Sequence, residues 1–128
     1  MTDATLTRTG PTTIVLWVLR VLIAALFLFA AFMKLSGQAM MVQEFDVVGL
    51  GQWFRVFTGI LELAGAVAVV IPSVSAFGAA LLLLVDIGAF FAQVFVIRMD
   101  WIHTIVIGAV LAALIFMQRA QIRTRLGL

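Results

Sequence analysis

Residues 14–33 read IVLWVLRVLIAALFLFAAFM, twenty consecutive residues in which Arg20 is the one charged side chain. About 20 apolar residues in helical form are needed to span the roughly 30 Å hydrocarbon core of a bilayer. The stretch is longer than the apolar region of a secretory signal peptide, so we expect the protein to retain it as a helix. It therefore predicts a chain that folds within a membrane.

The composition of the whole chain supports this prediction. Of its 128 residues, 65% are hydrophobic and 11% are charged, whereas soluble domains are about 45–50% apolar and about a quarter charged. The chain has no cysteine, which excludes disulfides, thiol chemistry and thiolate metal ligands. Its single histidine, His103, has no obvious ligand cluster beside it, and the basic residues form no nucleic-acid patch. We therefore expect no metal site and no nucleic-acid partner.

Three further apolar segments follow the first, and each is long enough to cross a bilayer. The connections among these three are short, which favours antiparallel neighbours. We predict an all-α membrane protein, a four-transmembrane-helix antiparallel bundle formed by residues 14–118. Its predicted parts are an N-terminal arm at 1–13, helices at about 14–33, 54–71, 76–97 and 101–118, and a basic C-terminal tail at 119–128.

The one long connection, residues 34–53, has a pattern of its own. Met41, Phe45 and Val48 follow the i, i+4, i+7 spacing of one helical face, and the acidic residues of the segment lie elsewhere on the wheel. This pattern predicts a short amphipathic helix at the membrane interface, between the first and second membrane helices.

Ionisable side chains on three apolar segments are expected at a similar depth. Each would cost about 2.5–3.5 kcal/mol if it lay unpaired at the centre of a membrane helix, so we expect them to face the bundle interior and pair. Gln93 lies seven residues beyond the acid of its own segment and shares its face. The predicted polar membrane cluster is Arg20, Glu62, Asp86 and Gln93, with Lys34 and His103 at its mouth.

The charges of this cluster do not balance, because one arginine faces two carboxylates. We expect Arg20 to neutralise one acid. The other is balanced if Lys34 reaches inward, or it holds a proton near neutral pH because leaving water disfavours its charged form. Plainer interpretations stay open: an arginine–glutamate pair that only clamps helices, Asp86 as a satisfied polar residue, Lys34 as a snorkelling anchor, and His103 as an interfacial residue.

Small residues predict where the helices pack closely. Gly59, Gly65 and Ala66 share the face of Glu62, and Gly108 lies within the fourth segment. Small side chains let the backbones of membrane helices approach one another. We predict that these four positions are helix contacts.

Two of these stretches resemble a known family. LFLFAAFMKLSG (26–37) resembles the end of the first helix of DoxX-type membrane proteins, and FTGILELAGAVAVVIP (57–72) resembles their second helix. Gly59, Glu62 and Gly65 stand at the matching Gly-x-x-Glu-x-x-Gly positions. Asp86 is not expected from the family, and Gln93 stands where relatives often carry histidine.

The resemblance implies a small four-helix protein of the bacterial inner membrane. Some members are subunits of a thiosulfate:quinone oxidoreductase, others belong to membrane complexes that handle oxidative stress and thiols, and eukaryotic relatives assist receptor assembly. The arginines of the C-terminal tail favour cytoplasmic N- and C-termini.

We therefore expect an accessory or anchoring subunit of a quinone-linked redox or respiratory complex in the membrane. It would not be an enzyme on its own, would hold no intrinsic cofactor, and would bind a quinone or a lipid. Its partners would be the lipid bilayer and either another protein or further copies of itself. The alternatives are an oligomeric proton-coupled transporter of small solutes, and a structural or assembly factor without chemistry.

Overall fold

The computed structural model describes residues 10–98 and 100–127, and within these ranges the regular structure is entirely helical. This confirms the prediction of an all-α protein. The elements are α2 (Pro11–Leu35), α3 (Ala39–Val48), α4 (Gln52–Val69), the 3₁₀ turn η1 (Pro72–Val74), α5 (Ser75–Phe91), the π-helical η2 (Ala92–Ile97), α6 (Ile102–Met117) and α7 (Arg119–Leu126).

The helix ends differ from the predicted ones by a few residues, and two prolines explain most of this. α2 begins at Pro11, three residues earlier than predicted, because proline is well suited to the first turn of a helix. α4 ends at Val69, two residues earlier than predicted, because Pro72 disfavours helical backbone at Ile71, which is extended.

The predicted terminal segments also differ in extent. Of the predicted N-terminal arm at 1–13, residues 1–9 lie outside the described residues and 11–13 belong to α2. The predicted basic tail is helical from Arg119 to Leu126 and forms α7. The helix predicted between the first two membrane segments is α3, which ends at Val48 and is capped by Gly49 in the left-handed conformation, φ +84°.

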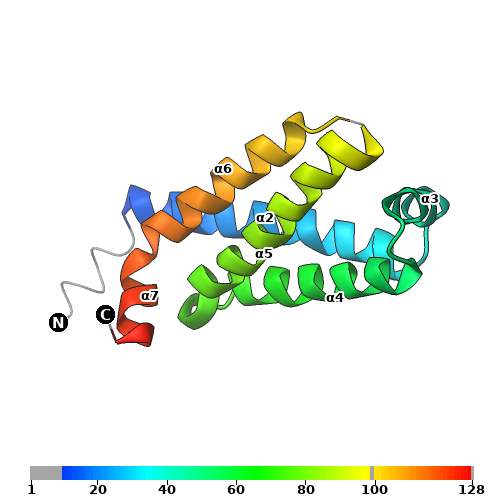
Figure 1. Cartoon of the computed structure of the whole chain (residues 1–128). Helices are drawn as coiled ribbons and strands as arrows, with labels where there is room; N and C mark the ends of the chain where they lie inside the picture. The colour runs from blue at the N-terminus through cyan, green and yellow to red at the C-terminus, as the bar shows by residue number, and fades with distance from the viewer. Residues whose placement is uncertain (1–9, 99, 128) are drawn as a thin grey trace.

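Neighbours in the chain are also neighbours in space. α2 packs against α4, α4 against α5, and α5 against α6, while α3 contacts α4 and η2 (Figure 1). The start of α2, the α4–α5 connection and α7 lie at one end of the molecule, and α3 and the α5–α6 connection lie at the other (Figure 1). A buried apolar core joins α2, α4, α5 and α6, with Phe27, Val69, Leu82 and Leu111 among its members.

Three stretches are long and apolar enough to cross a membrane: α2, α4, and the run Pro72–Ile97 formed by η1, α5 and η2. α6 and α7 reach that length only together and are bent by 59° at their junction, which would make a fourth span. The outer faces of these helices carry large exposed apolar side chains, as lipid contact requires. Examples are Leu22, Phe29, Leu84 and Phe116, all more than half exposed.

Glycine allows α4 and α5 to touch through their backbones. A Cβ atom at Gly78 would lie 2.7 Å from the backbone nitrogen of Val69 and 2.8 Å from the Cβ of Ala68. A Cβ atom at Gly65 would lie 2.6 Å from Leu82. The interhelical distance is therefore set by the absence of side chains at these two positions.

We expect Gly78→Ala to destabilise the protein and Gly88→Ala to leave it unchanged or slightly more stable. Both glycines are in α5, but a Cβ at Gly88 meets nothing within 4 Å. Overpacking costs about 1–3 kcal/mol, whereas replacing an unhindered helical glycine by alanine gains up to about 1 kcal/mol. Thermal unfolding of the two purified variants in detergent checks this, and equal melting temperatures would contradict it.

Candidate functional site

A buried ion pair joins α2 to α4. Lys34 Nζ lies 3.0 Å from Glu62 Oε1, and the exposed fractions of the two side chains are 15% and 6%. Gly59 makes room for this approach, because a Cβ there would lie 3.2 Å from Lys34 Cβ and 3.0 Å from Leu35. Lys34 thus reaches inward, which the sequence left open as one of two ways of balancing an acid, and it pairs with Glu62.

The end of α2 and the helix α3 are fastened to the start of α4 by a polar network. Arg55 donates through Nη1 to the carbonyl oxygen of Lys34 and through Nε to Gln52 Oε1, the latter at 2.7 Å. Gln52 Nε2 donates to the Val42 carbonyl at 2.9 Å and to Asp46 Oδ1 at 2.7 Å. These bonds hold α3 across the end of the bundle.

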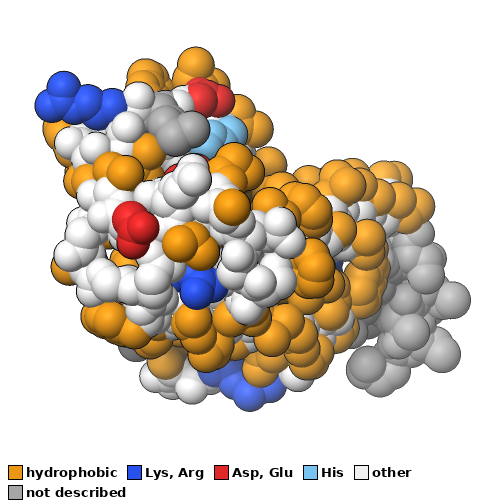
Figure 2. All heavy atoms as spheres, turned by 90° about the vertical axis from the view of Figure 1, so that its right-hand side faces the viewer, with side chains coloured by type: hydrophobic (Ala, Val, Ile, Leu, Met, Phe, Trp, Pro, Cys, Tyr) orange, Lys and Arg blue, Asp and Glu red, His pale blue; other side chains and the backbone are white. Residues whose placement is uncertain are grey.

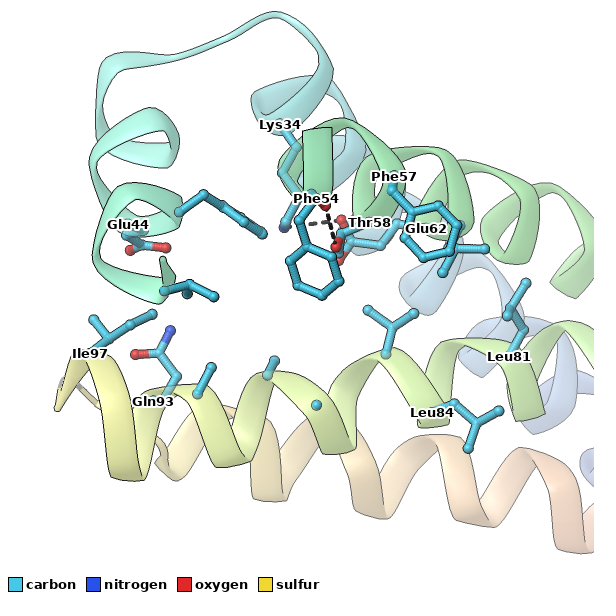
Figure 3. Close-up of a pocket in the computed structure, with 17 residues that line it drawn as sticks. Lys34, Glu44, Phe54, Phe57, Thr58, Glu62, Leu81, Leu84, Gln93 and Ile97 are labelled. Carbon is cyan, nitrogen blue, oxygen red and sulfur yellow. Dashed lines mark hydrogen bonds and ion pairs between the residues drawn. The ribbon is translucent and has the colours of Figure 1, made fainter. Parts of the chain in front are cut away.

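A cavity of about 370 Å³ lies between α3, α4, α5 and η2 (Figure 3). Its walls are mainly apolar and include the rings of Phe45, Phe54 and Phe57. Its polar lining is Lys34, Glu44, Thr58, Glu62 and Gln93. Seen from the α3 end, hydrophobic side chains are interspersed with backbone and uncharged polar atoms, and charged side chains stand as isolated spots (Figure 2).

The polar groups stand on facing walls of this cavity. Lys34 and Glu62 lie on the α2–α4 side, and Gln93 extends from η2 on the opposite side (Figure 3). Gln93 belongs to the π-helical segment, a type of turn found often at functional sites. Glu62 Oε1 is the atom that takes the Lys34 ammonium, whereas the buried Gln93 Oε1 has no hydrogen-bond partner among the described residues.

Arg20 belongs to a different site, at the other end of the bundle. Its Nε donates to Ser75 Oγ at 3.2 Å, its Nη2 donates to Gln118 Oε1 at 2.6 Å, and its guanidinium lies over the Trp17 ring, 4.6 Å from the centroid. Ser75 Oγ in turn donates to the Val69 carbonyl at 2.7 Å. Arg20 therefore ties α2 to the α4–α5 corner and to the end of α6 through neutral partners, and the structure does not bring it together with either acid.

Asp86 occupies a third place, between α5 and α6. Its Oδ2 atom lies only 2.9 Å from where a Cβ of Gly108 would be, and the residue is 6% exposed. The ion pairs of the described residues are Lys34–Glu62 and a longer contact of 3.8 Å between His103 and Asp100, so Asp86 takes part in neither. The predicted membrane cluster is thus divided into three separate environments.

The predicted packing residues lie at helix contacts of different kinds. Gly59 faces α2, Gly65 faces α5, Ala66 is fully buried in the core, and Gly108 lies against Asp86. His103, predicted at the mouth of the cluster, is exposed on α6.

The residues that hold the charged side chains in place were not predicted from the sequence. Ser75 and Gln118, which bind Arg20, and Gln52 and Arg55, which hold α3, all lie at ends of apolar segments. A polar residue at the end of an apolar segment can reach the end of a neighbouring helix. Their location at segment ends was therefore the feature of the sequence that could have identified these residues. In the part of the chain that the structure describes, no three His, Asp or Glu side chains gather as a metal site would require.

The helical fold, its apolar outer faces and its buried ion pair define a small integral membrane protein. Residues 18–117 match the model of the DoxX-like family, and the chain belongs to this family. The resemblance inferred from the helix motifs is therefore confirmed. No curated protein and no solved structure matches the chain significantly.

We expect Lys34→Met to lower the free energy of unfolding by about 3–5 kcal/mol, because it leaves Glu62 as an unpaired buried charge. The double variant Lys34→Met/Glu62→Leu should recover most of this loss, since it removes both charges together. Unfolding in mixed micelles measures the four members of this cycle. Additive losses in the double variant would show that the two side chains do not act as a pair.

Proposed function

We propose that this protein is a four-span antiparallel bundle that binds a quinone and serves as an accessory subunit of a membrane redox complex. The observation that carries the proposal is the cavity between α3, α4, α5 and η2, which combines aromatic and aliphatic walls with polar groups on two facing sides. A flat apolar ring with polar atoms at its edge fits such a lining. The ring would lie among the phenylalanines, and its polar atoms would reach Lys34, Glu62 and Gln93.

The volume of the cavity supports a ligand of this size. Small-molecule pockets span roughly 300–1,000 Å³, so a cavity of about 370 Å³ suits a single ring with short substituents. The exposed apolar faces of the bundle would allow a longer tail to continue into the lipid. When bound, a quinone would supply the two-electron redox chemistry, and the chain's own residues would hold and orient its ring.

As an accessory subunit, the chain would bind the quinone while a partner protein that carries a redox centre supplies the electrons. α7 brings Arg119, Arg123 and Arg125 to the end where α2 begins, which supports placing that end in the cytoplasm of a bacterial cell. The outer apolar faces of the helices would serve as contacts to lipid, to the partner, or to further copies of the chain.

We expect Gly88→Leu to abolish quinone binding without unfolding the protein. Gly88 lines the cavity and has open space beside it, so a leucine side chain would enter the cavity rather than collide with its wall. Titration of a short-chain alkyl benzoquinone into the protein in nanodiscs should give a dissociation constant at least about tenfold weaker for the variant. Gly88→Ala is the matched control, since its methyl group takes up little of the cavity.

Equal binding to the wild type, Gly88→Ala and Gly88→Leu would contradict this cavity as the quinone site. Empty nanodiscs correct for partitioning of the probe into lipid. A thermal unfolding curve shows that the leucine variant retains its fold.

The accessory role has its own test. Purification from native membranes in a mild detergent should recover the chain with a stoichiometric protein that carries a redox cofactor. Recovery of the chain alone would contradict the subunit role if chemical crosslinking before extraction also captures no partner and leaves the yield of the chain unchanged.

A further inference from the structure

α7 is a short helix that is fastened along the end of the bundle. It leaves α6 at a bend of 59°, directly after the last apolar residues of that span. Gln121 Nε2 donates to the Pro72 carbonyl at 2.6 Å, and Gln121 Oε1 accepts from the Ala76 backbone N–H at 2.9 Å. Arg125 Nη2 donates to the Ser73 carbonyl at 3.1 Å. These bonds to the α4–α5 connection hold α7 at the level where hydrocarbon gives way to lipid headgroups.

The face of α7 that is turned away from this connection is basic and amphipathic. Arg119, Arg123 and Leu126 follow the i, i+4, i+7 spacing of a single helical face, and all three are exposed. Gln121 and Arg125, which contact the α4–α5 connection, are four residues apart on another face. Basic side chains beside an apolar one are typical of helices that lie in a membrane interface. The free face of α7 therefore suits a lipid surface.

The charged side chains of the described residues at this end of the bundle are all positive. Arg119, Arg123 and Arg125 lie on α7, and Arg20 lies behind its start, where it donates to Gln118. The described acids are on α3, within α4 and α5, and at the α5–α6 connection. Accordingly, the ion pairs of the described residues include none of these four arginines. This end carries a positive charge that no described acid offsets.

Most N–H groups of the α7 arginines are free to bind a ligand. A guanidinium has five N–H groups. Arg119 donates through Nη1 to the Phe116 carbonyl at 2.8 Å, and Arg123 makes no side-chain hydrogen bond to another described residue. Like charges four residues apart on a helix repel one another. An anion between Arg119 and Arg123 removes this repulsion, and phosphate oxygens match the paired N–H groups of arginine.

We propose that the free face of α7 binds the phosphate of an anionic phospholipid, with Arg119 and Arg123 as donors and Leu126 against the acyl region. A lipid is the source because Arg119 lies over the ring of Phe116, 4.2 Å from its centroid, and that ring belongs to the exposed apolar surface of α6. An anionic headgroup is favoured over a zwitterionic one by the unopposed positive charge of this end. The inference is independent of the cavity and of quinone binding.

Tryptophan fluorescence gives a local readout of this surface. Trp17 lies beside Arg20 near the start of α7, whereas Trp53 and Trp101 lie at the α3 end, at the starts of α4 and α6. The full chain with Trp53→Phe and Trp101→Phe keeps Trp17 as its single tryptophan. It is reconstituted in phosphatidylcholine vesicles with a rising share of brominated phosphatidylglycerol or of equally brominated phosphatidylcholine. Bromine on the acyl chains quenches the tryptophan that those chains contact.

The brominated phosphatidylglycerol should associate at Trp17 about fivefold more tightly than the brominated phosphatidylcholine, because two exposed arginines attract its charge. High salt should reduce this preference, since it screens exposed charges. The chain with Trp17→Phe, which keeps a ring beside Arg20, reports the other end through Trp53 and Trp101. There the two lipids should quench almost equally.

Variants assign the preference to the free face of α7. Arg123→Gln should reduce it several-fold, Arg119→Gln/Arg123→Gln should abolish it, and Arg119→Lys/Arg123→Lys should retain most of it because the charges stay. Arg98→Gln is the matched control, since Arg98 is also an exposed arginine but follows η2 at the opposite end. Unchanged quenching by brominated phosphatidylcholine shows that Trp17 keeps its place in each variant.

Three outcomes would overturn the inference. The first is equal quenching of Trp17 by the two lipids, and the second is a preference that survives Arg119→Gln/Arg123→Gln. The third is an equal preference at Trp53 and Trp101, which would show a general effect of membrane charge. Inorganic phosphate, added at constant ionic strength, separates a lipid from a free anion. If it displaces the brominated phosphatidylglycerol, the assignment to a lipid is wrong.

Discussion

The ion pair between Lys34 and Glu62 is the interaction on which the arrangement of the α3 end depends. In a hydrocarbon environment a lone carboxylate in the middle of a helix is costly, so Glu62 must find a cation from within the bundle. Gly59, less than one turn before it, lets α2 come close enough for Lys34 to reach inward. Arg55 donates hydrogen bonds to the carbonyl of Lys34 and to Gln52, which in turn binds α3. The position of Lys34 is therefore linked, through Arg55 and Gln52, to the position of α3. The cavity is the space left beneath α3 once these contacts are made.

The helices could be predicted from the sequence because a long apolar segment in a small chain has few possible structures other than a membrane helix. Pro11 and Pro72 then move the ends by two or three residues for reasons of backbone geometry alone. The helix at 39–48 was also predictable, since its spacing of apolar residues needs no knowledge of its neighbours. What could not be predicted is which charged side chains meet, because that depends on the rotation and the depth of each helix.

Arg20 illustrates this limit. Its position in the middle of an apolar run indicated an acidic partner, but Lys34 lies fourteen residues further along α2, or about 21 Å at 1.5 Å per residue. Arg20 and the Lys34–Glu62 pair therefore belong to opposite ends of the bundle. The partners of Arg20 are Ser75 and Gln118, the latter 98 residues away in the chain. Neutral partners and the Trp17 ring can satisfy a guanidinium without an acid, since it has five N–H groups to place.

The two acids are separated by the thickness of α5, and this separation bears on function. Val85, Gly88 and Ala89 face the cavity, whereas Asp86 points to α6 and Gly108. A proton-coupled transport path through both acids would have to cross α5, from the cavity on one side to the α6 contact on the other. Ligand binding makes no such demand, because Glu62 and Gln93 already face one space from two walls. The arrangement of the polar groups thus favours a binding subunit over a transporter, and it leaves Asp86 with a role in the contact between α5 and α6.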